Sequence, residues 1–185
     1  MDQANSNNNL GDLYESDLKI RVISINELDS QLTDFIECTH DREFGDDSMI
    51  YAVPEWYILG YLKNIPVTQI GILQRTITIN EKPFLIGGVS FLITEPKYRN
   101  NGFASIIMKK AVLFIRNKLG LPFCLLTCKP RLESLYAKMG WRSINEPNVL
   151  VQPTGNRSCG GLIMVNECGG IQWPSGRIDF RGLPW

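Results

Sequence analysis

Apolar and polar positions divide the chain into a series of predicted strands and helices. Residues 19–23 alternate apolar and charged side chains, as a strand with one buried face does. Apolar residues then recur at helical spacing between residues 28 and 36, after Asn26, a residue that can cap a helix. Residues 40–55 are mostly polar and predict a loop with one short helical piece.

The middle of the chain predicts a hairpin followed by a helical crossover. Strands are expected at residues 56–62, 68–79 and 84–94. Residues 80–83 form the turn of the hairpin, and an amphipathic helix over 103–118 ends before Gly120. The apolar segment 122–127 then reads as a strand buried on both faces and parallel to the strand before the helix.

The rest of the chain adds a second helix over 130–139 and strands near 149–151 and 162–165. This order of elements predicts an α+β or mixed α/β fold with one βαβ unit. Without an internal repeat or a linker, residues 18–185 are expected to form a single domain with a β-rich tail at about 155–185. The polar residues 1–17 are expected to form a mobile arm.

Composition excludes several classes of function. Among 185 residues, 19 Lys and Arg balance 19 Asp and Glu, which gives no support for nucleic-acid or membrane-surface binding. No apolar run approaches the ~20 residues that span a bilayer, and the polar amino terminus predicts no signal peptide. Five scattered cysteines argue for reduced thiols and a cytoplasmic location. Cys124 and Cys128 have no second pair or histidine nearby, so no metal site is expected.

Residues 91–105 carry the clearest chemistry. Leu92, Ile93 and Thr94 are strand-prone, Pro96 ends the strand, and a helix begins just after Gly102. The first N–H groups of a helix lack intrahelical partners and carry the positive end of its dipole, so they favour an anion such as phosphate. An ordinary strand-to-helix connection with a glycine is the alternative for this stretch alone.

Two motifs resemble those of the GNAT acyltransferases. Arg99-x-x-Gly102-x-Ala104 is similar to the loop whose backbone amides bind the pyrophosphate of acetyl-coenzyme A in that family. The segment from Leu135-Tyr136 to Gly140-Trp141 resembles the box whose tyrosine protonates the departing thiolate. The resemblance implies a central, mostly antiparallel sheet with one parallel βαβ pair splayed for coenzyme A, and helices on both faces. The residues expected to bind acetyl-CoA are Leu92, Ile93, Thr94, Arg99, Asn100, Asn101, Gly102, Phe103, Ala104 and Ser105.

Two branches of this family are visible in the rest of the chain. Gln74-Arg75, residues 153–155 and the segment from Asp179 to Trp185 look like the aminoglycoside 2′-N-acetyltransferases, which modify an antibiotic and end in a tryptophan whose carboxylate reaches the drug. Residues 119–130 and 173–179 look like the nodulation N-acyltransferases, which acylate an amino sugar oligosaccharide. Both branches transfer an acyl group to an amine on a sugar.

The sequence departs from the drug-modifying branch at three acidic positions. Ser90 stands where that branch carries a strand glutamate thought to relay a proton through water. Residues 156–160 replace an acidic run, and Leu183-Pro184 replaces an acid before the terminal tryptophan. A polycationic aminoglycoside needs carboxylates, so these changes weaken that substrate assignment.

The resemblance and the residues together predict an acetyl-CoA-dependent N-acetyltransferase acting on a small-molecule primary amine, with aminoglycosides or other amino sugars as candidates. Tyr136 is the expected general acid, because a phenol is still protonated at neutral pH; Ser90 could hold a water, and no residue stands out as the base. The residues expected to bind substrate are Asp46, Asp47, Glu55, Asp179 and Trp185. A longer-chain N-acyltransferase and a GNAT-fold binding protein with little turnover are the alternatives. Relatives that pair through their sheets suggest a homodimer.

Overall fold

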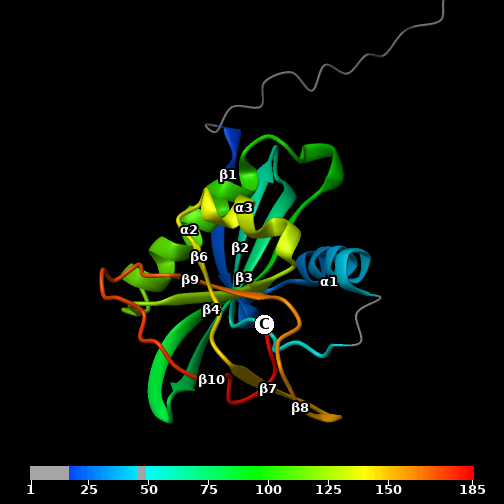
Figure 1. Cartoon of the computed structure of the whole chain (residues 1–185). Helices are drawn as coiled ribbons and strands as arrows, with labels where there is room; N and C mark the ends of the chain where they lie inside the picture. The colour runs from blue at the N-terminus through cyan, green and yellow to red at the C-terminus, as the bar shows by residue number, and fades with distance from the viewer. Residues whose placement is uncertain (1–16, 46–48) are drawn as a thin grey trace, which may run out of the picture.

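The computed structural model describes residues 17–45 and 49–185 of the chain (Figure 1). Its helices are α1 (Ser30–Phe44), α2 (Phe103–Asn117) and α3 (Glu133–Ala137), with short 3-10 turns η2 (Ile25–Glu27), η3 (Pro96–Tyr98) and η4 (Pro130–Leu132). Its strands are β1 (Lys19–Ser24), β2 (Trp56–Leu62), β3 (Ile65–Ile79), β4 (Lys82–Thr94), β5 (Cys124–Cys128), β6 (Arg142–Ile144), β7 (Asn148–Gln152), β8 (Gly155–Arg157), β9 (Leu162–Asn166) and β10 (Ile178–Asp179).

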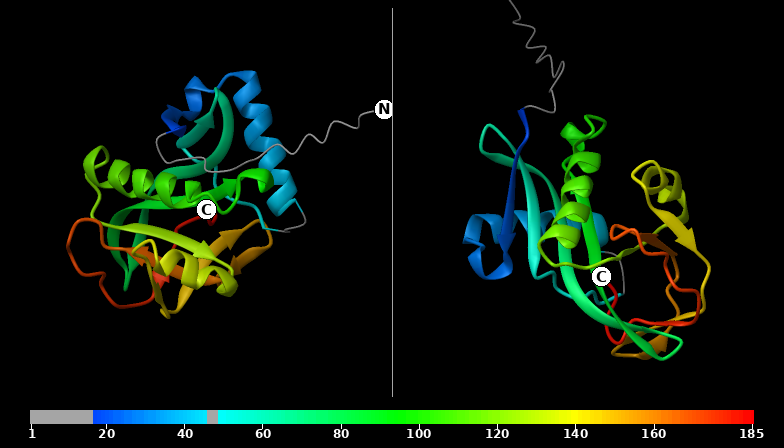
Figure 2. Two further views of the ribbon diagram at one scale, coloured as in Figure 1. Left: turned by 90° about the horizontal axis from the view of Figure 1, so that it is seen from above. Right: turned by 90° about the vertical axis from the view of Figure 1, so that its left-hand side faces the viewer.

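The strands form one mixed sheet that curls into a half-barrel in its lower part (Figures 1 and 2). Their order is β6-β9-β5-β4-β3-β10-β7-β8, with β2 also paired to β3 and β1 to β2. Most neighbours run antiparallel, whereas β4 with β5 and β7 with β10 run parallel. The α+β architecture with one parallel pair joined by a helical crossover is therefore confirmed.

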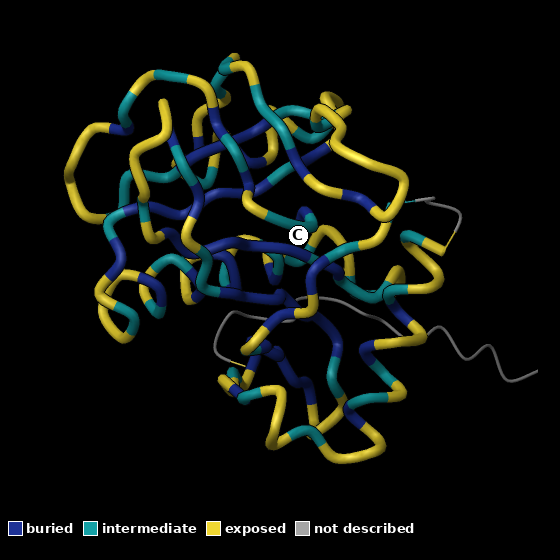
Figure 3. Tube along the Cα trace, turned by 90° about the horizontal axis from the view of Figure 1, so that it is seen from below, coloured by how far each residue is buried: buried dark blue, intermediate teal, exposed yellow. Residues whose placement is uncertain are grey.

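Two helices cover opposite faces of the sheet. In β2, Tyr57, Leu59 and Tyr61 pack with Leu32 and Ile36 of α1. Ile58 and Leu62, which alternate with them, pack instead in the cluster that includes α2. Figure 2 shows this arrangement, and Figure 3 shows buried stretches through the middle of the trace with exposed stretches mostly at its outside.

The β-rich tail covers the remaining part of the face opposite α2. β10 inserts between β3 and β7, and Trp173, Phe180 and Trp185 are buried in a cluster with Leu125 of β5. A tail that supplies a strand and three large aromatic side chains contributes core to the sheet. The Gly- and Trp-rich segment thus packs as an integral part of the fold.

The predicted elements of the central sheet are confirmed with small shifts in their ends. The helix expected after Asn26 begins instead at Ser30, with the Asp29 side chain accepting the Leu32 N–H at 2.8 Å, and Ser24 caps the preceding η2. α1 also continues to Phe44, so its last turn occupies the start of the segment expected to be a loop. The helix expected over 130–139 divides into η4 and α3.

Three short strands, β6, β8 and β10, were not predicted, because each has two or three residues and depends on pairing with distant segments. The predicted arm over residues 1–17 lies outside the described residues except for its last residue. All five cysteines are unpaired thiols. No helix within the described residues is long and apolar enough to cross a membrane.

Tyr57 links packing under α1 to stability at high pH. Burial, with a smaller contribution from the Glu37 carboxylate, raises the pKa of Tyr57 to about 12. In the unfolded chain a tyrosine loses its proton near pH 10, so from about pH 10 to 12 the unfolded state binds fewer protons and the protein loses stability.

We expect Tyr57→Phe to reduce this alkaline loss by about 2 kcal/mol. Urea unfolding of both proteins at pH 9 and pH 11.5 measures the difference. An equal fall in unfolding free energy for the two proteins would contradict the role of the Tyr57 phenol.

Candidate functional site

A gap opens between the parallel strands β4 and β5. These strands pair only at Gly87 with Cys124 and Gly88 with Leu125, where the Gly87 N–H donates to the Phe123 carbonyl at 2.9 Å. β4 then continues to Thr94 and β5 to Cys128 without further pairing. Backbone groups on the facing edges beyond this point are available to other partners.

Two glycines allow the strands to meet where the gap begins. A Cβ on Gly87 would lie 2.5 Å from Ile115 of α2, and a Cβ on Gly88 would lie 2.5 Å from the Trp185 indole. The strand is therefore held between the helix on one face and the tail on the other. Any larger residue at either position would push one of these covers away.

Trp185 lines the tail side of the gap. Its indole Nε1–H donates to the Leu125 carbonyl at 3.0 Å, and its carbonyl accepts a hydrogen bond of 3.4 Å from Thr127 Oγ1. The Arg75 guanidinium lies 5.6 Å from the centre of the indole. Trp185 thus satisfies part of the β5 edge that β4 leaves unpaired.

We expect Trp185→Phe to destabilise the protein by about 1–3 kcal/mol beyond its loss of buried area, because it leaves the Leu125 carbonyl without a donor. Trp173→Phe is the matched control, since the buried Trp173 Nε1 has no hydrogen-bond partner among the described residues. Urea unfolding compares the two variants. Equal losses of stability would show that the indole hydrogen bond contributes nothing.

A bulge in β4 lies beside the gap. Phe91 and Leu92 stand opposite the single residue Ile70 of β3, and Phe91 has a φ of +50°. Ser90 precedes the bulge; its Oγ is buried and, within the described chain, has no hydrogen-bond partner. The bulge thus turns the backbone at the level where the two strands have separated.

The loop after β4 leaves the start of α2 open. Gly102 has a φ of +76°, no side chain caps the helix, and a Cβ on Gly102 would meet nothing within 4 Å. The Asn101 amide donates to the carbonyls of Tyr98 and Arg99 at 3.0 Å each, which fixes the turn from inside. The first N–H groups of α2 therefore face open space and fit an anion such as a pyrophosphate.

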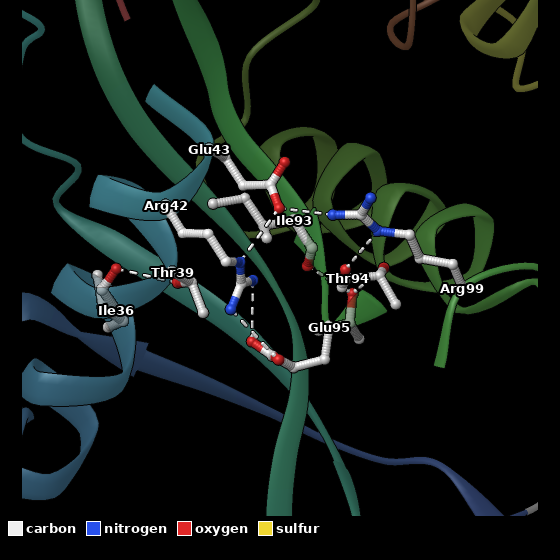
Figure 4. Close-up of polar contacts among 9 residues, drawn as sticks. Ile36, Thr39, Arg42, Glu43, Ile93, Thr94, Glu95 and Arg99 are labelled. Atoms are coloured by element: carbon white, nitrogen blue, oxygen red, sulfur yellow. Dashed lines mark hydrogen bonds and ion pairs between the residues drawn. The ribbon is translucent and has the colours of Figure 1, made fainter. Parts of the chain in front are cut away.

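Arg99 supports this loop through its side chain. Its Nε donates to the Thr94 carbonyl at 3.0 Å, and its guanidinium reaches the Glu43 carboxylate of α1 at 2.5 Å (Figure 4). Arg42 makes two hydrogen bonds to Glu95, at 3.1 and 3.4 Å. These contacts tie the end of α1 to the end of β4. They direct Arg99 toward the protein, so the loop's backbone amides are the groups left for a phosphate.

Tyr136 reaches the core on the α2 side of the sheet. It lies in α3, is 8% exposed, and packs in one cluster with Cys128 of β5 and with Ile107 of α2. Burial, followed by the neighbouring Cys128 thiol, raises the pKa of Tyr136 well above its usual value. The phenol therefore keeps its proton throughout the neutral pH range.

The predicted substrate-binding residues do not all gather at the gap. Asp179 pairs with Thr78, near the hairpin end of β3, and its carboxylate accepts the Arg181 N–H at 2.8 Å. Glu55 is exposed just before β2, and Asp46 and Asp47 lie outside the described residues. In the part of the chain that is described, no three His, Cys, Asp or Glu side chains form a metal-binding group.

Sequence reasoning missed two features beside the bulge. His40 of α1 and Phe91 pack with their ring centres 4.5 Å apart, and Gln69 of β3 is fully buried with its amide unpartnered by any described residue. The bulge could not be predicted, because it leaves no local pattern in the sequence. The presence of a single histidine was the one sequence feature that could have drawn attention to this region.

Comparison with known families identifies the chain. The model of the family "Nodulation protein A (NodA)" matches residues 34–159, which is more than half of the chain. The chain belongs to the NodA family. Of the two branches that the sequence resembles, the nodulation-type acyltransferases are thus the one that the family match supports. A search of curated proteins found no significant match.

Solved structures share the fold of this NodA-family chain. Escherichia coli ElaA is 13% identical, with a TM-score of 0.59 over 81% of this chain and 99% of its own. The E. coli GNAT family N-acetyltransferase YhbS, solved in complex with CoA, is 12% identical, with a TM-score of 0.57 over 88% and 89%. FeeM, an N-acyl amino acid synthase from uncultured soil microbes, is 10% identical, with a TM-score of 0.56 over 83% and 93%. The GNAT fold expected from the two motifs is confirmed.

Proposed function

We propose that this protein is an N-acyltransferase that moves an acyl group from a coenzyme A thioester to the primary amine of an amino sugar. The observation that carries the proposal is the gap between β4 and β5, which leads directly to the open start of α2 at Gly102. The nodulation N-acyltransferases that the sequence resembles supply the acceptor class, an amino sugar.

The donor end of this site is built mainly from backbone. The N–H groups after Gly102 would hold the pyrophosphate, and the edges of the gap would accept the extended arm of the thioester through main-chain hydrogen bonds. A backbone N–H of residues 92–94, beyond the bulge, would polarise the thioester carbonyl. None of these contacts depends on a side chain. Amino-acid substitutions elsewhere in the chain would therefore leave them intact.

Tyr136 would complete the transfer by protonating the departing sulfur. The Tyr136 phenol packs with Cys128 of β5, so its proton would be within reach of a thiolate that forms on the α2 side of the gap. The neutral amine attacks the carbonyl carbon, the C–N bond forms and the C–S bond breaks. The Tyr136 proton passes to sulfur, and the N–H proton that is lost as the amide forms returns through solvent to the Tyr136 phenolate.

Thiol release tests the function. Acetyl-CoA, octanoyl-CoA and palmitoyl-CoA are each offered with D-glucosamine, an aminoglycoside, a polyamine and a peptide amine. We expect release with glucosamine; the sequence alone favours acetyl-CoA, whereas the NodA family match favours a longer chain. Coenzyme A binding without release for any pair would instead support a binding protein.

We expect Gly102→Ala to raise the KM for the thioester donor about tenfold, because the added Cβ would enter the proposed phosphate position. Gly120→Ala is the control, since Gly120 has a φ of +68° and equally open surroundings at the other end of α2. Steady-state kinetics compares the two. A similar KM for both variants would remove the start of α2 from the donor site.

We expect Tyr136→Phe to lower kcat about 10²-fold while leaving donor affinity unchanged, because only the proton for the departing thiolate is lost. Tyr57→Phe serves as control, since it also removes a buried phenol with a raised pKa. Turnover and calorimetric binding of coenzyme A measure the two effects. Unchanged turnover would exclude Tyr136 as the acid.

A further inference from the structure

Four aromatic side chains gather beside the β4 bulge on the face opposite α2. His40 and Phe44 of α1 contact Phe91 with ring centres 4.5 and 5.7 Å apart, and Tyr51 lies 5.7 Å from Phe91. All four rings are half-buried, so each keeps part of its surface accessible. We call this group, His40, Phe44, Tyr51 and Phe91, the aromatic subsite.

Polar contacts hold α1 and the segment before β2 beside the aromatic subsite. The salt bridges of Arg42 and Glu43 tie the last turn of α1 to Glu95 and Arg99. The buried Gln152 of β7 makes two hydrogen bonds to the backbone of Ile50, at 2.8 and 2.9 Å, next to Tyr51. A constellation fixed by three elements suits the binding of a small group in one orientation.

Strand alternation places this subsite across the gap from Tyr136. Ile86 and Gly88 of β4 face the tail, and Ser90 follows them on the same face, where its Oγ would lie 3.0 Å from a Cβ on Gly71. Val89 faces α2, the side on which Tyr136 packs. An amine at Phe91 and an acid at Tyr136 would therefore approach a thioester in the gap from opposite sides.

We propose that the aromatic subsite binds the acceptor amine and that His40 is the catalytic base that deprotonates it. This inference rests on the proposed function. Ring faces attract an ammonium group and stack on a sugar ring, and an imidazole nitrogen can accept a proton. Among the described residues that pack here, the other ionisable groups are Tyr51 and the exposed Asp41, whose carboxylate lies 4.0 Å from His40 Nδ1.

Other nearby charges are already engaged. Glu43 pairs with Arg99 and Arg42, and Glu95 pairs with Arg42. The unpartnered Ser90 Oγ and Gln69 amide lie in the described sheet beneath this face, where they could hold a water between the amine and His40.

The proton balance of the step closes without a further reactant. His40 takes one proton from the ammonium form of the acceptor and releases it to solvent. The free amine then forms the C–N bond as the C–S bond breaks. The second N–H proton, lost as the amide forms, balances the proton that the departing thiolate takes.

The test uses His40→Gln and His40→Ala with D-glucosamine and the donor that gives the fastest thiol release. We expect kcat/KM for glucosamine at pH 8 to fall about 10²-fold, with donor affinity unchanged. The wild-type to variant ratio should vary with pH, because only the wild type carries a side chain at this position that can take a proton from the bound ammonium group. Added imidazole should partly restore His40→Ala.

Asp34→Asn, an exposed change on the same helix, is the matched control and should keep wild-type kinetics. Equal rates for the His40 variants and wild type, or a loss that neither varies with pH nor responds to imidazole, would overturn the role as base. Urea unfolding of each variant identifies any loss of fold. An NMR titration of the wild-type protein with D-glucosamine does not depend on the variants.

A separate readout distinguishes this inference from the proposed function. His40 is the only histidine in the chain, so an untagged protein gives one imidazole Cε1–H resonance by NMR. Titration of the wild type with D-glucosamine should shift this resonance even without a donor. An unshifted resonance overturns the subsite, whereas a shift in a protein that releases no thiol would retain amine binding and refute acyl transfer.

Discussion

The early separation of β4 and β5 is the constraint on which the rest of the structure depends. Parallel strands normally continue their ladder, yet here the pairing stops after Gly88 and both edges carry backbone groups that need partners. Ile115 of α2 and the Trp185 indole press on adjacent glycines where the ladder ends. Helix α2 and the tail therefore both contact β4 where its pairing with β5 ends. Neither can shift without disturbing the pairing of Gly87 and Gly88 with β5.

Local chemistry explains which parts of the fold could be predicted from sequence. The strands β2 to β5, the helix α2 and the turn at Gly102 are each encoded by residues that are close together in the sequence. These elements could therefore be predicted. The start of α1 was misplaced because Ser24, Asn26 and Asp29 are all able to cap a helix, and tertiary packing selects among them. Its end was missed because Thr39, a polar residue, faces the sheet and interrupts the apolar pattern.

The candidate site divides in the same way. The proposed donor end follows from motifs, because its groups are backbone amides whose position is fixed by the local turn. The proposed acceptor end joins α1, the segment before β2, and a bulge whose existence depends on the register between β3 and β4. Register is a long-range property of the sheet, so no window of sequence around Phe91 could have shown that His40 lies against it.

Two segments cover the face opposite α2. The tail covers one end of that face and α1 covers the other, and Ser90 and Phe91 lie in the interval between Trp185 and α1. An acceptor that reaches the gap from this side must pass both covers. The proposed donor contacts are made by backbone groups and the proposed acceptor contacts by side chains, so substitutions can change the acceptor contacts and leave the donor contacts in place. Acceptor choice in this protein should therefore follow the tail and the end of α1 rather than the loop at Gly102.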